Sequence, residues 1–508
     1  MEKILRQPEK AVKNKYDLII IGGGIYGVTL SYMASLKGLK SLLIERDDFG
    51  GATSYNSLRI LHGGLRYLQK LDLHRFFESV SERKWFFKNY PGLVEPLACL
   101  MPLYNRGLHR KSIFRIALFL NDLLSWKRNK GISEKYHLKA GKIISPEEVK
   151  RTFPLVDTKN LKGGALWYDG SMPDSQKVLI EILKTSCSMC GTALNYFEIK
   201  TLLTDKNNVA GVSAVDRETG ITYEFKSEIV VNTAGPWSRE VAGKLHKDFP
   251  ELFKSSIAWN ILFNRKALAD HAVAITPNKP GAKTFFLRPW KGMLFAGTIH
   301  EPWDKVEKNP QPKKKSILNF INDINCCIPG YNLSEKDILH IYSGLLPAKA
   351  DNSTELTVRE VILDHSEDNG LKGLYSVSGV KFTTARLVAE KTINKIFPDR
   401  SETTKEPQND LPESYSGVYD YDWYIEDNNN NWKSELKKII DEESVVHLDD
   451  LILRRTSIGD NPLRALELAE KIALLFGWDS SRTEMEIERL KKHYNGNREV
   501  KNTEFVLK

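Results

Sequence analysis

The sequence predicts an α/β fold, and three observations near the N-terminus support this prediction. An apolar run rich in β-branched residues occupies residues 18–21 and leads into a turn of closely spaced glycines. An apolar segment of helix-forming composition follows over residues 28–36, and a second short apolar run at 42–44 ends on Glu45. The period changes from strand to helix and back to strand, so a strand–turn–helix–strand unit is expected at the start of the chain.

The glycines of this unit have the spacing G-x-G-x-x-G, at Gly22, Gly24 and Gly27. The first allows a tight turn, the second lets a diphosphate approach the backbone, and the third lets the helix pack closely on the strand. The helix N-terminus then directs unpaired N–H groups and a partial positive charge at the phosphates. Glu45 follows at about the 20-residue distance at which an acidic side chain accepts the ribose hydroxyls. The unit therefore predicts dinucleotide binding.

A long loop of small and hydroxyl residues follows Glu45 and favours a permanently bound flavin over an exchangeable nicotinamide. Residues 47–54 read D-D-F-G-G-A-T-S, and residues 62–68 read H-G-G-L-R-Y-L. In these two segments the chain resembles the FAD-dependent glycerol-3-phosphate dehydrogenase and oxidase family, part of the D-amino-acid-oxidase-like flavoprotein superfamily. The resemblance continues at residues 164–170, 230–237 and 375–386, and at 449–456 near the C-terminus.

The resemblance implies a Rossmann-like FAD-binding domain of the glutathione-reductase type, an antiparallel-sheet substrate domain and a C-terminal helical cap. We expect an FAD-dependent oxidoreductase core at 1–398, a linker at 399–425 and a C-terminal helical domain at 426–508. Within the core we expect FAD-binding pieces at about 16–105, 145–245 and 340–398, a helical insert at about 106–144 and a substrate domain at about 246–339. Two strands are predicted over residues 284–290 and 293–298, around a turn at Lys291 and Gly292.

The motifs and the resemblance together assign a set of residues to the cofactor. The segment after Gly379 leads into a helix-forming stretch, whose N–H groups would face the electron-rich edge of the flavin ring. The residues predicted to bind FAD are Gly22, Gly24, Gly27, Glu45, Arg46, Thr53, Ser54, His62, Gly63, Gly64, Leu65, Ala234, Gly235, Trp237, Gly379, Lys381, Phe382 and Thr383.

The family reaction takes a hydride from a secondary alcohol to flavin N5, while a base or water takes the hydroxyl proton. The resemblance therefore implies oxidation of sn-glycerol 3-phosphate to dihydroxyacetone phosphate, with quinone or oxygen as the electron acceptor. Such a site needs cations for the phosphate and a polar group near the hydroxyl. The candidate catalytic residues are Arg66, Arg359, Lys381, His62 and His300.

One departure from the family pattern concerns the substrate. The family carries Y-S-G-x-R-P where this chain reads Tyr342 to Pro347, so Leu346 replaces an arginine that reaches the substrate. Losing a charged donor of this kind costs roughly 2–4 kcal/mol of binding. Either Arg288, His300 or Lys349 compensates, or the substrate is a different polyol, sugar derivative, hydroxy acid or amine.

Composition restricts the class of protein further. A net charge of +9 fits an anionic substrate or an anionic membrane surface, and no segment resembles a nucleic-acid-binding module. No run of about 18 apolar residues indicates a membrane-spanning helix, and the polar, basic residues 1–15 do not read as a secretory signal. Five cysteines, with Cys187 and Cys190 spaced C-x-x-C but lacking a second ligand pair, indicate a reducing compartment and no metal site. A cytoplasmic protein is expected, with a homodimer left open.

The segment 109–130 is apolar with basic ends, and it has two interpretations. It could form an amphipathic helix on the inner face of an anionic membrane as a peripheral contact. It could equally pack against the substrate domain, and the sequence favours this core role.

Overall fold

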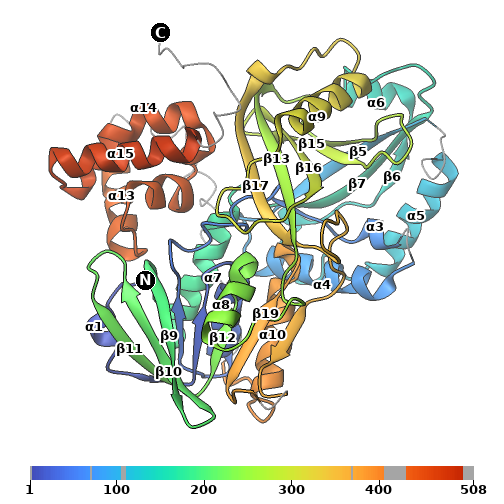
Figure 1. Cartoon of the computed structure of the whole chain (residues 1–508). Coiled ribbons are helices and arrows are strands. Elements are labelled where there is room, and N and C mark those ends of the chain that lie inside the picture. Colours follow the sequence, from blue (N-terminus) through green and yellow to red (C-terminus); the bar gives the residue numbers. More distant parts are fainter. Residues whose placement is uncertain (1–2, 69–70, 105–109, 368–369, 405–430, 496–508) are drawn as a thin grey trace.

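The computed structural model describes residues 3–68, 71–104, 110–367, 370–404 and 431–495 (Figure 1). The centre of the FAD-type unit is a six-stranded sheet, parallel apart from the antiparallel edge strand β18. Its strands in spatial order are β18 (Val361–Asp364), β19 (Leu374–Ser378), β12 (Val230–Asn232), β2 (Leu18–Ile21), β3 (Ser41–Ile44) and β8 (Gly191–Leu194). The chain therefore returns to this sheet from segments hundreds of residues apart.

The two faces of this sheet are covered differently, as the alternation within β2 requires. Leu18 and Ile20 pack against helices, whereas Ile19 and Ile21 pack under a second, four-stranded sheet. The helices on the first face are α2 (Ile25–Leu36), α4 (Leu73–Asn89), α7 (Ser175–Met189) and α10 (Ala385–Ile396). The four-stranded sheet consists of β1 (Lys15–Tyr16), β11 (Thr222–Ser227), β10 (Asn208–Asp216) and β9 (Phe197–Asp205).

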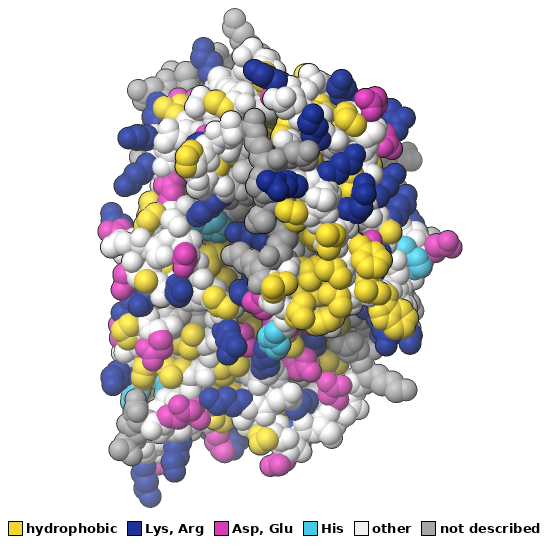
Figure 2. Space-filling model, turned by 90° about the vertical axis from the view of Figure 1, so that its right-hand side faces the viewer, with side chains coloured by type: hydrophobic (Ala, Val, Ile, Leu, Met, Phe, Trp, Pro, Cys, Tyr) yellow, Lys and Arg dark blue, Asp and Glu magenta, His cyan; other side chains and the backbone are white. Residues whose placement is uncertain are grey.

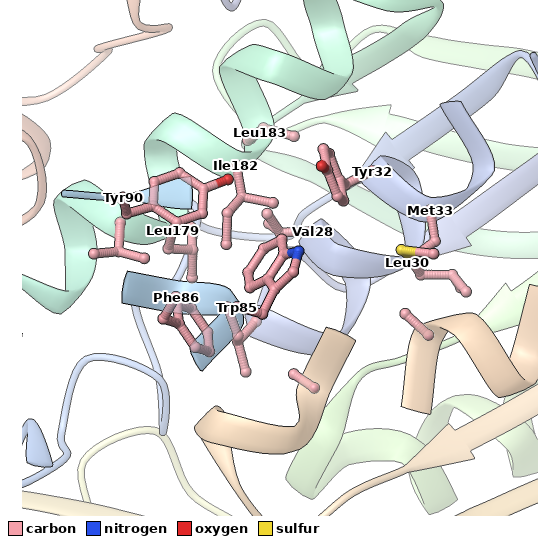
Figure 3. Close-up of a cluster of buried hydrophobic side chains, with 14 of the residues drawn as sticks. Val28, Leu30, Tyr32, Met33, Trp85, Phe86, Tyr90, Leu179, Ile182 and Leu183 are labelled. Atoms are coloured by element: carbon pink, nitrogen blue, oxygen red, sulfur yellow. The ribbon is translucent and has the colours of Figure 1, made fainter. Parts of the chain in front are cut away.

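The helical side forms the larger core of this unit. Figure 3 shows Val28 and Tyr32 of α2, Trp85 and Phe86 of α4 and Leu179 of α7 converging on one another. Trp85 contacts Tyr32 edge-on, with ring centroids 6.0 Å apart. Because α2 is buried on nearly every side, its N-terminus is held rigidly at the edge of the sheet.

The strands of the second large sheet come from more segments of the chain than the substrate domain predicted from the sequence. This sheet contains the antiparallel strands expected in the substrate domain, and β15 and β16 meet at the turn of Lys291 and Gly292, both with positive φ. It also takes up strands from stretches that the sequence grouped with FAD binding, because antiparallel pairing joins segments that no local pattern connects. Its strands are β17 (Ile338–Pro347), β13 (Ser255–Lys266), β16 (Met293–Pro302), β15 (Phe285–Trp290), β14 (Ala272–Ile275), β5 (Glu95–Leu103), β7 (Gly163–Ser171) and β4 (Ile60–Leu61), with β6 (Lys142–Ile144) beside β7.

Further helices surround these sheets, and Figure 1 places α5 at the side of the molecule farthest from the C-terminal helices. Cys187 packs on the core at the end of α7, and Cys190 donates to the carbonyl of Leu39 at 3.1 Å. No helix in the described part of the chain combines the length and the apolarity needed to cross a bilayer. The remaining core helices are α1 (Pro8–Ala11), α3 (Leu65–Leu68), α5 (Lys111–Leu124), α6 (Pro146–Thr152), α8 (Ser238–Leu245) and α9 (Lys314–Cys327).

Helix α5 keeps most of its apolar side chains outside the core. Of these side chains, only Phe114 and Leu118 are buried, at 2% exposure each. Figure 2 shows this side of the molecule, with a continuous yellow surface. Because only one side of the helix is packed, the core role that the sequence favoured for this segment is wrong for most of its apolar residues. Six others on α5 and the turn after it are exposed, between 36% and 72%: Ile113, Ile116, Phe119, Leu120, Leu123 and Trp126.

The C-terminal unit has three α-helices within the described residues 431–495: α13 (Asn431–Glu442), α14 (Pro462–Ala473) and α15 (Ser480–Asn495). The expected linker lies largely outside the described residues, which stop at 404 and resume at 431. A buried π-helical turn, Asp450–Arg455, precedes α14 and faces the loop after β3. There Arg455 donates two hydrogen bonds of 2.8 Å to the two carboxylate oxygens of Asp48. Arg454 adds a third bond to Asp48 through Nε at 2.6 Å.

Candidate active site

A cavity of about 900 Å³ lies between the two large sheets, at the carboxyl ends of β2, β3, β12 and β19. This volume is at the upper end of the roughly 300–1,000 Å³ typical of cofactor and ligand sites. Most residues assigned to the cofactor from the sequence line it: Gly22, Gly24, Glu45, Arg46, Thr53, Ser54, His62, Ala234, Gly235, Trp237, Gly379, Lys381, Phe382 and Thr383.

The predicted phosphate turn has the backbone that its glycines require. Gly22 adopts φ +106°, and Gly24 is the residue from which α2 begins. Gly27 lies beneath the turn, where a Cβ atom would come within 1.9 Å of the Gly22 carbonyl oxygen. The backbone N–H of Ile25 donates to Ser54 Oγ at 3.0 Å, so the second loop is attached to the helix N-terminus. Backbone N–H groups and the helix dipole at this end suit a diphosphate.

Glu45 is buried at the end of β3, as expected of a ribose-binding carboxylate. Its oxygens accept hydrogen bonds from the backbone N–H of Gly23 at 2.6 Å and of Asp47 at 2.8 Å. Burial raises the pKa of Glu45 above its ordinary value, and the charge of Asp47 adds to the shift. Beside it, the Arg46 guanidinium lies 4.8 Å from the centre of the Trp237 ring, which encloses this end of the cavity.

At the other end of the cavity, the chain after Gly379 is fixed by Tyr26 of α2. The Tyr26 hydroxyl accepts a hydrogen bond from the Lys381 N–H at 3.0 Å and donates to the Lys381 carbonyl at 2.9 Å. Only glycine fits at 379, because a Cβ atom there would lie 2.0 Å from the Tyr26 ring. The Lys381 ammonium donates to the hydroxyl of Tyr67 and lies over its ring. One cation and one hydroxyl are thus paired inside the cavity.

His62 lines the cavity and is oriented by Asp169 of β7. Its Nδ1 lies 3.2 Å from Asp169 Oδ2, and the other carboxylate oxygen accepts from the Gly63 N–H and from Arg83, both at 2.7 Å. Burial alone would raise the pKa of Asp169, but His62 and Arg83 together lower it to about 2. Asp169 is therefore a carboxylate that holds His62 in one orientation, and sequence reasoning had not given it that role.

The remaining glycines and Leu65 of this segment are structural. A Cβ atom on Gly63 would overlap the Arg83 guanidinium, and Gly64 has φ +90° against Phe76. Leu65 begins α3 and packs on the core cluster of the larger sheet. These residues shape the loop beside the cavity without lining it.

Three basic side chains gather at one end of the cavity: Arg66, Lys283 and His300. His300 lies in the second half of β16. Its Nδ1 is buried and has no hydrogen-bond partner in the described part of the chain. Burial, and then the charges of Lys283 and Arg66, lower the pKa of His300 to about 4. His300 is therefore neutral at pH 7 and lies next to two permanent cations.

Leu346 also lines the cavity. Of the three residues suggested to replace the missing arginine, His300 and Lys349 line the cavity and Arg288 does not. Arg288 is buried elsewhere and donates to the carbonyls of Leu58 and Arg59, each at 3.0 Å, and to a serine hydroxyl. Because these groups of the protein occupy its guanidinium donors, Arg288 does not replace the missing arginine.

Arg359 is the one predicted catalytic residue that the structure does not bring into the cavity. It is exposed, although its neighbours Thr357 and Val358 line the wall. Lys283 is the residue that sequence reasoning missed. It precedes the predicted strand in a polar stretch, where no motif distinguishes it from other surface lysines, and only the approach of β15 to β16 brings it beside His300.

The cavity, the diphosphate turn and the buried ribose carboxylate together fit a dinucleotide flavin. Residues 17–394 match the family model of FAD dependent oxidoreductases. The glycerol-3-phosphate dehydrogenase of Synechocystis sp. is 30% identical over 399 residues, which cover 75% of this chain and 70% of that protein. The aerobic glycerol-3-phosphate dehydrogenase of Staphylococcus aureus is 29% identical, with 76% and 68% covered.

A solved structure shares the whole architecture. The glycerol-3-phosphate dehydrogenase of Bacillus halodurans, complexed with FAD, superposes with a TM-score of 0.72 at 20% identity, covering 98% of both chains. The mitochondrial relative from Schizosaccharomyces pombe is 29% identical, and this chain spans 62% of its length. The family model and the Synechocystis relative show that this chain belongs to the FAD-dependent oxidoreductases, as an enzyme of the glycerol-3-phosphate dehydrogenase type.

Proposed function

We propose that this chain oxidises sn-glycerol 3-phosphate to dihydroxyacetone phosphate. The observation that supports this substrate is the gathering of Arg66, Lys283 and His300 at one end of the cavity, which Lys381 also lines. A phosphate monoester carries close to two negative charges at pH 7 and needs such a set of donors. Bound FAD supplies the acceptor for the hydride that leaves the substrate carbon.

The phosphate would be held by the cations on the β15–β16 side of the cavity. Arg66 offers a planar fork of donors, and Lys283 offers a point charge at the end of a flexible stem. Lys283 is exposed, and its Nζ lies 3.3 Å from Thr354 Oγ1. Lys349 is less suitable, because its Nζ lies 3.8 Å from Glu355, whereas the charge of Lys283 acts on His300 in the cavity. We therefore assign to Lys283 the part that the family arginine has at position 346.

The hydroxyl proton would leave to His300. His300 is neutral above pH of about 4, and its unpartnered Nδ1 is free to accept a proton from a substrate hydroxyl. A dianionic phosphate beside His300 would offset the charges of Lys283 and Arg66, which raises the pKa of His300 and makes it a stronger base. Lys381, which donates to the Tyr67 hydroxyl, and Tyr67 itself line the cavity and would donate hydrogen bonds to the oxygen as it becomes a carbonyl.

Replacing Lys283 with methionine tests this assignment. Removing a charged donor costs about 1.5–3 kcal/mol, so KM for sn-glycerol 3-phosphate should rise roughly 10–150-fold while kcat changes little. Oxidation of unphosphorylated glycerol should not change. Steady-state kinetics on both substrates measures this, and Lys279→Met is the matched control because Lys279 pairs with Asp323 on the surface at 2.6 Å. Equal KM values in wild type and Lys283→Met would contradict the role of Lys283.

Leu346 supports a second candidate, the oxidation of another anionic hydroxy compound. An apolar side chain in the wall leaves less cationic surface than the family pattern, which suits a ligand with a carboxylate or an extra apolar group. Phosphorylated polyols and hydroxy acids compared under the same anaerobic conditions separate the two candidates, because only the preferred one reduces the flavin rapidly. For the electron acceptor we propose a quinone or oxygen. Turnover rates measured with a quinone alone and with oxygen alone distinguish the two.

A further inference from the structure

Tyr26 connects the diphosphate turn to the opposite end of the cavity. It lies in the first turn of α2, between Gly24 and Gly27, at a position where the glycine motif prescribes no side chain. Its side chain lines the cavity, and its hydroxyl reaches the backbone of Lys381 in the segment that follows β19. The helix that begins at the diphosphate turn is therefore joined to the segment that carries Lys381.

The Tyr26 hydroxyl serves both backbone polar groups of Lys381. It accepts from the Lys381 N–H at 3.0 Å and donates its one proton to the Lys381 carbonyl at 2.9 Å. Burial raises the pKa of Tyr26 above its ordinary value, so the hydroxyl keeps that proton at neutral pH. The ring occupies the space beside Gly379, where a Cβ atom would lie 2.0 Å from it. The contact thus uses both the ring and the hydroxyl of a tyrosine.

The segment that Tyr26 holds lies between two firmly placed elements. β19 before it is hydrogen-bonded to strands on both sides, and α10 after it packs into the helical core. Residues 379–384 between them are mostly half-buried. Within the described part of the chain, no side chain caps the 3₁₀ turn Phe382–Thr384 that leads into α10. The Tyr26 hydroxyl therefore determines where the backbone of Lys381 lies.

A second tyrosine holds the other end of Lys381. The Lys381 ammonium donates to the Tyr67 hydroxyl and lies 4.1 Å from the centre of the Tyr67 ring. Arg75 packs on the same ring, with its guanidinium 4.9 Å from the ring centre. Because a lysine stem is flexible, the place of its ammonium depends on the backbone at one end and on the hydroxyl at the other. Tyr26 and Tyr67 thus fix the two ends of one side chain.

We propose that Tyr26 is a positioning residue for the reaction and that it acts through Lys381. The inference rests on the proposed function, in which Lys381 donates to the oxygen that becomes a carbonyl. A displacement of about 1 Å at a reacting centre can cost about 100-fold in rate. Without the Tyr26 hydroxyl, the Lys381 backbone loses two hydrogen bonds, and its ammonium is no longer held in one place. The phosphate would still bind to Arg66 and Lys283, so substrate affinity should change little.

Tyr26→Phe tests the proposal, because it removes one oxygen and keeps the ring beside Gly379. With FAD content unchanged, the rate constant of anaerobic flavin reduction by sn-glycerol 3-phosphate should fall about 10–100-fold. The half-saturating substrate concentration should stay within about twofold of the wild type. Lys381→Met should slow reduction at least as much, and Tyr26→Phe added to Lys381→Met should cause no further loss. Independent losses that multiply in the double variant would overturn the proposal.

Hydrogen–deuterium exchange of the FAD-loaded protein gives a readout that does not depend on turnover. Amides of residues 379–384 should exchange about tenfold faster in Tyr26→Phe, because the Lys381 N–H loses its acceptor. Tyr16→Phe is the matched control, since the buried Tyr16 hydroxyl donates to the Ala11 carbonyl at 3.0 Å, away from the residues that line the cavity. This control should keep the wild-type exchange over residues 379–384 and the wild-type reduction rate.

Two results for Tyr26→Phe would overturn the proposal: unchanged exchange over residues 379–384, or a wild-type rate of flavin reduction. A wild-type rate in Lys381→Met would instead contradict the role that the proposed function gives to Lys381, and with it the effect of Tyr26 on the reaction. The exchange measurement would then still show whether Tyr26 holds the Lys381 backbone.

Discussion

Gly27→Ala is expected to abolish FAD binding. The added Cβ atom would lie 1.9 Å from the Gly22 carbonyl oxygen and 2.8 Å from Thr233 Oγ1. Thr233 Oγ1 in turn donates to the carbonyls of Ile21 and Gly22, each at 3.0 Å, so the contact is with rigid backbone and not with a movable side-chain end. To make room, α2 must move away from β2, which opens the diphosphate turn and costs at least about 1–3 kcal/mol of stability.

The measurement is the flavin absorbance per chain after purification, together with the melting temperature. Gly243→Ala is the matched control, since Gly243 lies in α8 and the nearest atom to its Cβ would be 3.6 Å away. That change should leave FAD bound and stabilise the helix by about 0.5–1 kcal/mol. Full flavin content and an unchanged melting temperature in Gly27→Ala would contradict the phosphate-turn assignment.

Arg455→Ala is expected to destabilise the protein by about 3–5 kcal/mol, because it removes one partner of a buried ion pair. Arg455 and Asp48 are both buried, and they share two hydrogen bonds of 2.8 Å. Burial would raise the pKa of Asp48, but Arg455 and Arg454 together lower it to about 2. Asp48 begins the loop whose residues Thr53 and Ser54 line the cavity, so FAD should also be held less tightly.

Denaturant unfolding and titration with FAD measure the two effects of Arg455→Ala. Lys437→Ala serves as the control, because Lys437 and Asp441 form an exposed pair on α13 with about half of each side chain in solvent. Exposed pairs contribute about 0–1 kcal/mol, so the control should be close to the wild type. Similar unfolding free energies for the two variants would show that the C-terminal unit does not support the flavin loop.

The local parts of the site could be predicted from the sequence because chemistry and spacing coincide there. Period, glycine spacing and the terminal Glu45 predicted β2, α2 and β3, and the hairpin at Lys291 and Gly292 formed as its turn residues indicated. Backbone that must approach a ligand closely demands glycine, and glycine leaves a visible signature.

Non-local parts could not be predicted in the same way. The pairing of β5 with β7 and β14 and the role of Asp169 depend on strands distant in sequence. Lys283 and His300 lie next to the two strands of the predicted hairpin, but no local pattern shows that the hairpin directs them into the cavity. The exposure of the apolar side chains of α5 could not be predicted either, because an amphipathic pattern gives the apolar face of a helix but not what covers it. Arg288 shows the same limit: the sequence shows its charge, but not the backbone carbonyls to which it donates.

The central claim is that the cavity holds FAD with a phosphate-binding end beside it, and anaerobic reduction of the bound flavin tests it most directly. The purified enzyme should be yellow, and sn-glycerol 3-phosphate should bleach its visible flavin absorbance to completion, roughly 100-fold faster than glycerol at equal concentration. A protein that stays colourless after incubation with FAD would contradict the account. So would a flavin that glycerol bleaches as fast as its phosphate ester.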